Sequence, residues 1–388
     1  MESHELYWEI INVVHQRPLT PLLANYSALV GIAGAIFLIW GFSRLNQSTP
    51  HKAEQRFVLP IAVALMIAGL TNPILEVHQP GRVMYMYLFG WNVAGTAIIK
   101  FGVILLPLFT LLCWWLAVAV LRAEIETLLK NRSPALSRVG DFLTLWVRRY
   151  DPLTNHRCGK AIISTGFFLA VFAILYLGIF LMTEHGIVFW DSAFVPAVFF
   201  SSAVAAGAGG LSLMLPLGAY LTGEVMPEEN PRYMTILLTA SVISGALWLI
   251  WLQFIGHFGS VEASRALDLV NGPYRGLAWG WWFALGVLFP ITLLATPALR
   301  KISLLRMVAS VSAVIGSFAV RFAILNIGQS VPKSGAGYYQ YQMPWEMFGD
   351  LILDWIYLIG LIALFWLLLP YRDRVTRTSP TTVYEKKS

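Results

Sequence analysis

The sequence predicts an all-α polytopic integral membrane protein with about nine transmembrane helices, and three observations support this prediction. Apolar residues make up 57% of the chain and charged residues only 12%, whereas soluble domains contain about 25% charged residues. Aromatic residues are abundant, with 15 Trp, 15 Tyr and 23 Phe. Nine apolar segments are long enough to cross the hydrocarbon core of a bilayer, which takes about 20 helical residues.

The nine segments follow one another along the chain. They are residues 24–43, 57–75, 98–122, 160–182, 192–222, 233–256, 276–298, 303–326 and 347–370. Several exceed the minimum length, so we expect helix tilt or an extra turn beyond the bilayer. Residues 1–5 contain no basic stretch, so we expect no cleaved signal peptide and a first span that stays in the membrane.

Basic residues gather in four segments that a nine-span topology places on one side of the membrane. They are residues 44–56, 130–157, 300–306 and 372–387. By the positive-inside rule this side is cytoplasmic, which puts the N-terminus outside and the C-terminus in the cytoplasm. The acidic loop 223–232 is an exception on the basic side. The long loop 122–160 has apolar residues at helical spacing among its arginines, which predicts an amphipathic helix on the lipid surface or a docking surface for a partner.

The cysteine and histidine content excludes several redox centres in this chain. Its two cysteines, Cys113 and Cys158, are far apart and form no CxxC motif. We therefore expect no iron–sulfur cluster, which needs about four thiolates, and no c-type haem. None of the seven histidines is placed to face another from the interior of a span, so we expect no bound haem.

The most informative polar segment follows the second span. Glu76, His78 and Arg82 lie within seven residues at the predicted outer membrane edge, and an aromatic run then leads to Lys100. Ionisable groups near a bilayer are costly and therefore mark functional candidates. We expect such groups only at outer span ends or in outer loops, namely Glu76, His78, Arg82, Lys100, His185, Asp191, His257, Arg321, Asp350 and Asp354. This distribution argues against a continuous proton or ion path across the membrane.

An outer pocket of aromatic and polar residues suits a quinone, whose two ring oxygens need partners that exchange protons. Histidine titrates nearest to neutral pH, and tyrosine both donates and accepts hydrogen bonds. The candidates for quinone binding and proton relay are Tyr26, Glu76, His78, Arg82 and Tyr176. Plainer interpretations stay open: Tyr176 in an interfacial aromatic belt, His78 as a loop cap, Arg82 paired with Glu76, and Asn25 with Tyr26 as helix cap and belt residue.

Four local patterns, in this order along the chain, resemble the NrfD/polysulfide reductase membrane-subunit family. The first is residues 26–34, which contain a Gly-x-x-Gly; the second is residues 75–82, followed by aromatics. The third is residues 175–196, with a tyrosine, a Trp and a Pro, and the fourth is residues 321–346. The second pattern is most similar to the membrane component of tetrathionate reductase, where a leucine, an acidic residue, His-Gln and then Arg occur.

The resemblance implies an architecture and a site. An N-terminal four-helix bundle (residues 1–190) would hold the quinone site, residues 191–326 would form a second four-helix bundle, and residues 327–388 an outer loop, a ninth helix and a polar cytoplasmic tail. The quinone-site positions of the family fall on Tyr26, Glu76 and Tyr176, with His78 nearby. The polysulfide reductase subunit has a histidine where this chain has Tyr26, which gives His78 more weight. The ninth span exceeds the eight of shorter members.

The resemblance also implies a function. The chain would be the quinone-interacting anchor of a respiratory oxidoreductase in a bacterial or archaeal cytoplasmic membrane, supporting the quinol half-reaction only. A quinol of the menaquinol type would be oxidised at the outer face. Its electrons would pass to a ferredoxin-like iron–sulfur subunit and a molybdopterin catalytic subunit that reduces a sulfur compound such as tetrathionate or polysulfide.

Three alternatives stay open. Reverse flow, in which the subunit reduces quinone, is equally allowed by the residues. A secondary transporter is disfavoured because the two halves lack matching Gly/Pro-broken helices and midplane charges. A purely structural anchor is disfavoured by the titratable cluster.

Overall fold

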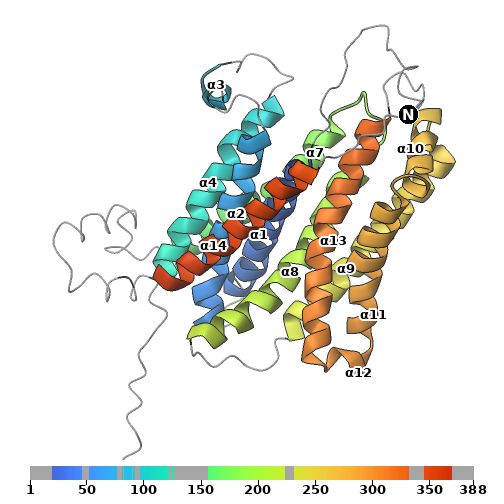
Figure 1. The fold of residues 1–388 in the computed structure, drawn as a ribbon. Coiled ribbons are helices and arrows are strands. Elements are labelled where there is room, and N and C mark those ends of the chain that lie inside the picture. Colours follow the sequence, from blue (N-terminus) through green and yellow to red (C-terminus); the bar gives the residue numbers. More distant parts are fainter. Residues whose placement is uncertain are drawn as a thin grey trace, which may run out of the picture.

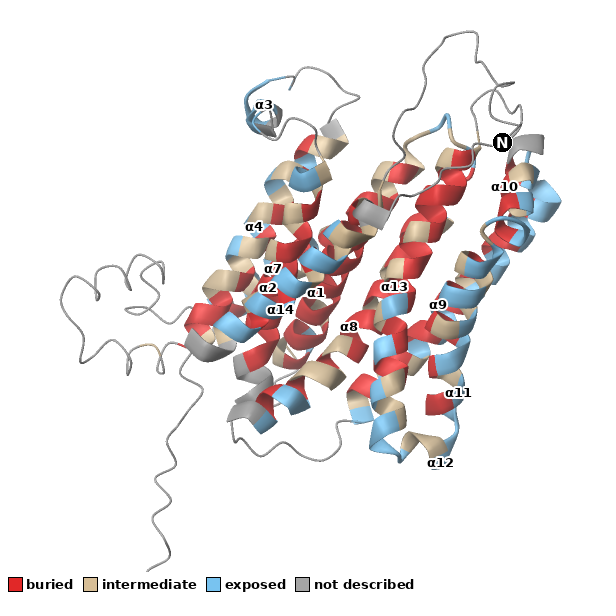
Figure 2. Ribbon diagram, in the orientation of Figure 1, coloured by how far each residue is buried: buried red, intermediate tan, exposed pale blue. Residues whose placement is uncertain are grey.

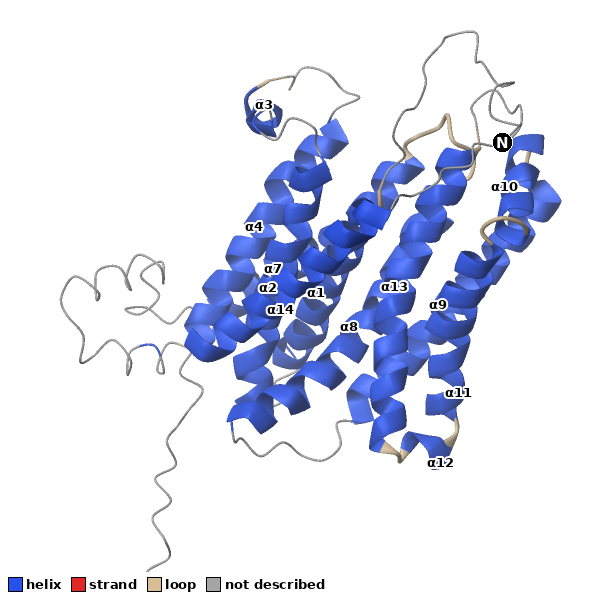
Figure 3. Ribbon diagram, in the orientation of Figure 1, coloured by secondary structure: helices blue, strands red, loops and turns tan. Residues whose placement is uncertain are grey.

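The computed structural model describes residues 20–45, 52–76, 81, 83–89, 91, 97–121, 125, 156–222, 231–331 and 345–368. In these residues the chain forms helices, turns and short loops, and no strand (Figure 3). Nine of the described helical segments are long and apolar enough to cross a membrane. The prediction of an all-α polytopic membrane protein is therefore confirmed.

The long helices agree closely with the predicted spans. They are α1 (Pro21–Leu45), α2 (Lys52–Glu76), α4 (Ala97–Val120), α7 (His156–Met182), α8 (Phe194–Thr222), α9 (Pro231–Phe258), the π-helix η4 (Gly276–Leu288) continued by α11 (Phe289–Ala295), α13 (Ser303–Ser330) and α14 (Trp345–Leu368). Three short helices were not predicted: α3 (Val83–Leu88), α10 (Val261–Asn271) and α12 (Pro297–Arg300). Figure 1 shows α3 and α10 at the upper end of the molecule and α12 at the lower end.

Helix α1 is the central helix of the fold. It packs against α2, α7, α8, α13 and α14, and 89% of its apolar window is buried (Figure 2). A helix that is apolar all round is expected in such a position. A Cβ on Gly34 would lie 2.8 Å from the carbonyl oxygen of Ala170 on α7, so the small residues of α1 permit the close approach of neighbouring helices.

The remaining long helices form a second packed group. Helix α8 contacts both α9 and α13, and η4 with α11 packs against α13 and α9. Gly286 of η4 and Gly316 of α13 mark the closest approach, because a Cβ on either would lie within 2.5 Å of the other's Cα. Helix α8 also contacts α1 and α7 and so joins the two groups.

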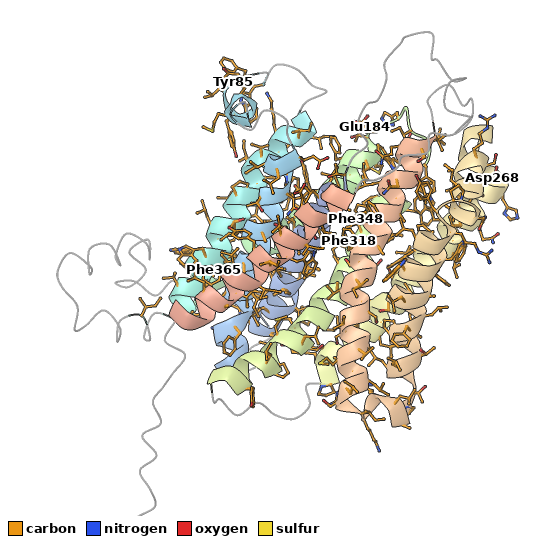
Figure 4. The ribbon with its side chains drawn as sticks, in the orientation of Figure 1. Tyr85, Glu184, Asp268, Phe318, Phe348 and Phe365 are labelled. Atoms are coloured by element: carbon orange, nitrogen blue, oxygen red, sulfur yellow. The ribbon has the colours of Figure 1, made fainter. Side chains whose placement is uncertain are left out.

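Helix α14 crosses α1 and α2 obliquely on the outside of the first group (Figure 1). Only 17% of its apolar window is buried. Phe348 and Phe365 lie near its two ends (Figure 4), and the ring of Phe365 is 6.0 Å from that of Trp114 on α4. The helix therefore covers the bundle with one face and leaves the other to lipid.

Candidate functional site

Two tyrosines meet inside the first group of helices, toward the upper end. Tyr26 of α1 and Tyr176 of α7 are 5% and 8% exposed and belong to one core cluster. Their phenol groups are close enough to interact electrostatically. Among the described residues, the Tyr176 hydroxyl donates only a long hydrogen bond, 3.4 Å, to the carbonyl oxygen of Ile99. Burial excludes the interpretation of either residue as an exposed belt tyrosine and leaves the Tyr176 hydroxyl able to bind a polar ligand.

The start of α4 shapes the space beside Tyr176. Gly102 faces the phenol ring, and a Cβ there would lie 2.2 Å from Cζ of Tyr176. Two residues earlier, Lys100 is 5% exposed. Its Nζ donates a 2.5 Å hydrogen bond to the carbonyl oxygen of Phe89 and lies 4.5 Å from the ring centre of Trp91. Lys100 thus ties the aromatic segment around α3 to α4, because a buried ammonium is stabilised by a carbonyl and an aromatic face.

Glu76 ends α2 and holds the start of α1. One carboxylate oxygen accepts a hydrogen bond from the Thr20 backbone N–H at 3.1 Å, and the other accepts from the Thr20 hydroxyl. The Thr20 hydroxyl oxygen in turn accepts from the N–H of Leu22 at 3.2 Å, as an N-cap does. The interpretation of Asn25 as the cap of this helix is therefore wrong. His78 and Arg82 lie outside the described residues, so their proposed roles stay predictions.

A second polar group lies between α1, α2 and α14. The sequence marked Asp354 and Asn25 separately but did not predict their association. We call Asn25, Thr71, Asn72 and Asp354 the Asp354 cluster. Asp354 Oδ2 accepts hydrogen bonds from the side-chain amides of Asn25 at 2.7 Å and Asn72 at 3.0 Å. Asp354 is only 4% exposed, and its helix is one of the nine membrane-spanning candidates. A buried carboxylate in such a segment is a functional candidate by default.

Arg321 of α13 is a buried cation at the junction of the two helix groups. It is 0% exposed. Its guanidinium donates to the hydroxyls of Ser27, Ser202 and Ser317 at 3.1, 3.0 and 2.8 Å. It also donates to two backbone carbonyls and lies 4.8 Å from the ring centre of Phe199. Neutral oxygens and an aromatic face surround this charge.

Arg321 and Asp354 correct the expected charge map. Both were expected at the outer ends of spans, but each lies nine residues inside its helix, which is about 14 Å along the axis at 1.5 Å per residue. The signal that marks them is a charged residue within a largely apolar window. Hydrophobicity alone does not show that the surrounding helices supply the polar partners.

The loop between α7 and α8 also lies at the upper end. Glu184 marks it in Figure 4. Nδ1 of His185 lies 3.0 Å from a carboxylate oxygen of Asp191, and both side chains are exposed. The Trp190 indole N–H donates to the carbonyl oxygen of Ile324 at 2.8 Å. This loop is fixed onto α13 by a buried tryptophan and presents an exposed histidine and carboxylate.

A cavity of about 660 Å³ lies at the opposite, lower end, away from these polar groups. It is lined mainly by apolar residues of α8, α9 and α13, and its polar rim includes Arg300, Lys301 and Arg306. Among the described residues, its lining contains no carboxylate or histidine. We therefore place the candidate functional site at the upper end.

The upper-end arrangement suits hydrogen bonding and proton exchange with a neutral polar ring. It offers two buried phenols, two amides and a carboxylate within helices α1, α2, α7 and α14. Among the described residues there is no group of three or more His, Cys, Asp or Glu side chains that would hold a metal ion. The described histidines with placed side chains, His185 and His257, lie in a loop and in the last turn of α9.

Comparison with known families identifies the family to which the chain belongs. Residues 16–333 match the family described as Polysulphide reductase, NrfD. The match covers more than half of the 388 residues, so the chain belongs to the NrfD family. It ends before α14 begins at Trp345. A search of curated proteins found no match.

Proposed function

From this family membership we propose that the chain is the quinone-interacting membrane subunit of a respiratory oxidoreductase. NrfD family members are membrane subunits that interact with quinones in molybdoenzyme complexes and partner with iron–sulfur and molybdopterin subunits. The observation that carries the proposal for this chain is the pair of buried phenols, Tyr26 and Tyr176, brought together from α1 and α7 at the upper end. A quinone ring needs donors and acceptors in an apolar slot, and two phenols supply both.

The substrate in this proposal is a quinol of the menaquinol type, oxidised at the upper end. Tyr26 and Tyr176 bind one ring oxygen, Glu76 and His78 carry protons to water, and Arg82 completes the polar rim. The electrons pass to a ferredoxin-like iron–sulfur subunit and then to a molybdopterin subunit. The terminal acceptor in this proposal is tetrathionate or another sulfur compound such as polysulfide. The resemblance of Glu76-Val77-His78-Gln79 to the tetrathionate reductase pattern supports it.

The upper end is the outer face in this proposal. Arg44, Arg300, Lys301 and Arg306 lie at helix ends of the lower side, whereas the described α7–α8 loop at the upper end has no Lys or Arg. Cytoplasmic loops carry the excess of Lys and Arg. The N-terminus is then outside, the C-terminus is cytoplasmic, and the partner subunits dock on the outer loops of a bacterial or archaeal cytoplasmic membrane. The N-terminal bundle, residues 1–190, holds the site; residues 191–326 form the second bundle.

The proposal is tested by substitutions that separate the quinone step from the rest of the complex. Tyr176→Phe and His78→Ala should lower quinol-linked turnover while activity with artificial dyes stays intact, because dyes bypass the quinone site. Tyr220→Phe is the matched control, since Tyr220 is 83% exposed at the lower end of α8. Unchanged quinol turnover in both site variants would overturn the assignment of this site.

A secondary transporter is the alternative that the buried charges favour. A transporter was disfavoured from the sequence partly because no midplane charge was expected, and Arg321 is a charge buried within its span. Its guanidinium, however, already makes five hydrogen bonds to protein oxygens, so it offers little to a transported substrate. Substrate-driven uptake by the purified protein in liposomes would support the transporter and exclude the redox subunit.

A further inference from the structure

The Asp354 cluster has more hydrogen-bond acceptors than donors. Asp354 Oδ1 has one donor within reach, the Thr71 hydroxyl at 3.2 Å. That hydroxyl lies closer, at 2.6 Å, to the carbonyl oxygen of Ala68, and its single proton cannot serve both. The Oδ1 atom of Asn25 is buried and has no partner among the described residues. Two acceptor atoms of the cluster are therefore short of a donor.

An unmet acceptor of this kind is costly, because a buried polar atom without a partner loses about 1–3 kcal/mol. Asn25 cannot relieve it by rotation, since its amide N–H groups already serve Asp354 and Asn72. No described Lys, Arg or His forms an ion pair with Asp354. The cluster is completed by a donor that the described protein does not supply.

Of the titratable groups around the cluster, Asp354 is the one placed to accept a proton inside the bundle. On α2, Glu76 is engaged by Thr20. On α1, Tyr26 follows Asn25 and lies toward Tyr176. On α14 itself, Asp350 lies one turn away and is exposed. Asp354 is the buried carboxylate that faces the α1–α2 interface.

We propose that Asp354 is the proton acceptor for quinol oxidation, and that its Oδ1 and the Oδ1 of Asn25 bind a quinol hydroxyl. This inference rests on the proposed function and deepens it. A quinol hydroxyl donates a hydrogen bond, whereas the carbonyl of an oxidised quinone only accepts one. A site short of donors therefore binds the reduced form better than the oxidised form.

Protons and electrons balance in this reaction. When one quinol O–H bond breaks, the proton goes to Asp354 Oδ1 and the electron goes to the iron–sulfur cluster of the docked partner. The second O–H bond gives its proton to water at the Glu76 rim and its electron to the same cluster. Asp354 then releases its proton to water at the upper end. The acceptor comes from α14, which begins beyond the family match that ends at residue 333, so this part of the site lies outside the matched residues.

The test compares three variants of the purified complex with its partner subunits. Asp354→Asn keeps the shape of the side chain and removes the base, Asp354→Glu restores a base, and Asp350→Asn is the matched control on the same helix. General-base catalysis contributes typically 10²–10⁴-fold, so Asp354→Asn should lower quinol kcat about 100-fold or more. Asp354→Glu should recover part of this loss, and Asp350→Asn and all dye-linked activities should stay at the wild-type level.

Infrared difference spectroscopy supplies a readout that a merely structural role would not change. Oxidation of bound quinol should produce a protonated-carboxyl band that shifts with ¹³C-aspartate labelling, persists in Asp350→Asn and is absent from Asp354→Asn. If Asp354→Asn fails to assemble, the labelled wild-type and Asp350→Asn complexes still decide whether a buried aspartate takes the proton.

Other outcomes separate the two proposals. Wild-type quinol turnover in Asp354→Asn, or a carboxyl band insensitive to aspartate labelling, overturns the role of Asp354 and leaves the quinone-binding function standing. Sodium-dependent thermal stability that disappears in Asp354→Asn makes the cluster a cation site and also overturns the proposal. Failure of the wild-type complex to oxidise any quinol overturns the proposed function itself.

Discussion

The phenol of Tyr176 occupies the space that a side chain at position 102 would fill. A Cβ added to Gly102 would lie 2.4 Å from the Tyr176 hydroxyl oxygen and 2.2 Å from Cζ. Because real Cβ atoms do not approach so closely, the glycine in α4 fixes where the α7 tyrosine sits. The position of the phenol, and so of any ring it binds, depends on a residue that has no side chain.

Gly102→Ala should therefore displace Tyr176 and impair quinol turnover without removing any polar group. Overpacking a well-packed interior costs about 1–3 kcal/mol, so we expect a lower melting temperature and at least a tenfold loss in quinol kcat/KM. Gly360→Ala is the control, because nothing lies within 4 Å of a Cβ at Gly360 in α14. Equal quinol kinetics in the two variants would show that the phenol position does not matter for turnover.

The Tyr26 hydroxyl should contribute to binding of the same quinol as Tyr176. Tyr26→Phe removes one buried hydroxyl and preserves the ring, and a lost hydrogen bond costs about 0.5–1.5 kcal/mol. We expect quinol KM to rise about two- to twelvefold, with dye-linked activity unchanged. The Tyr26→Phe/Tyr176→Phe double variant should show non-additive losses, because residues that share a ligand couple in a double-mutant cycle. Strictly additive effects would place the two phenols on different ligands.

Arg321 should be a major determinant of stability. Arg321→Met removes the donor that satisfies Ser27, Ser202 and Ser317, and Arg321→Lys keeps the charge but not the planar fork. Both variants should unfold at lower temperature in detergent, with Arg321→Met assembling poorly. Arg275→Ala, at an exposed site just before η4, is the control and should unfold like the wild type. Wild-type stability of Arg321→Lys would mean that the charge, and not the hydrogen-bond geometry, is what the fold requires.

Ionisation of Tyr274 should lower the stability of the folded protein at high pH. It lies in the loop before η4, and its hydroxyl is 2.7 Å from that of Ser330. Burial raises its pKa above the ordinary value of 10.0, and the hydrogen bond with Ser330 offsets part of the rise. A raised pKa in the folded state stabilises the protein fully below the unfolded-state pKa, and this stabilisation is lost as pH rises through the folded-state pKa. The melting temperature of the wild type should fall more steeply above pH 10 than that of Tyr274→Phe, and parallel curves would contradict this assignment.

The fold was predictable from the sequence because each span is a continuous apolar stretch, which depends only on local composition. The proximity of Tyr26 and Tyr176 was predictable from helix order and resemblance, whereas Glu76 is bound to Thr20. The pairing of Asn25 with Asp354, 329 residues apart, was not predictable. It depends on the oblique crossing of α14 over α1, and hydropathy does not determine crossing geometry. The π-helical form of residues 276–288 was also missed, because its composition is simply that of an apolar helix.

Quinol oxidation by the complex should be electroneutral. The protons and electrons of the proposed reaction both leave at the upper end. Between the level of Arg321 and the lower helix ends, the described spans contain no Asp, Glu, Lys or Arg. Examples are residues 57–75, 101–121, 161–182 and 307–320. Moving one charge against 100 mV costs about 2.3 kcal/mol, so a pump needs titratable groups spaced through this region. Arg321 adds a fixed positive charge at the junction, which repels a proton moving downward.

The measurement uses the complete complex in liposomes with a potential-sensitive dye during quinol-driven turnover. We expect no sustained potential in the wild type, since no charge crosses the bilayer. Valinomycin with potassium, which imposes a known diffusion potential, shows that the dye responds in the same vesicles. A sustained potential that scales with turnover and collapses with a protonophore would contradict electroneutrality. It would require a proton path through ordered water between the Asp354 cluster and the lower face, because the described side chains there provide no titratable steps.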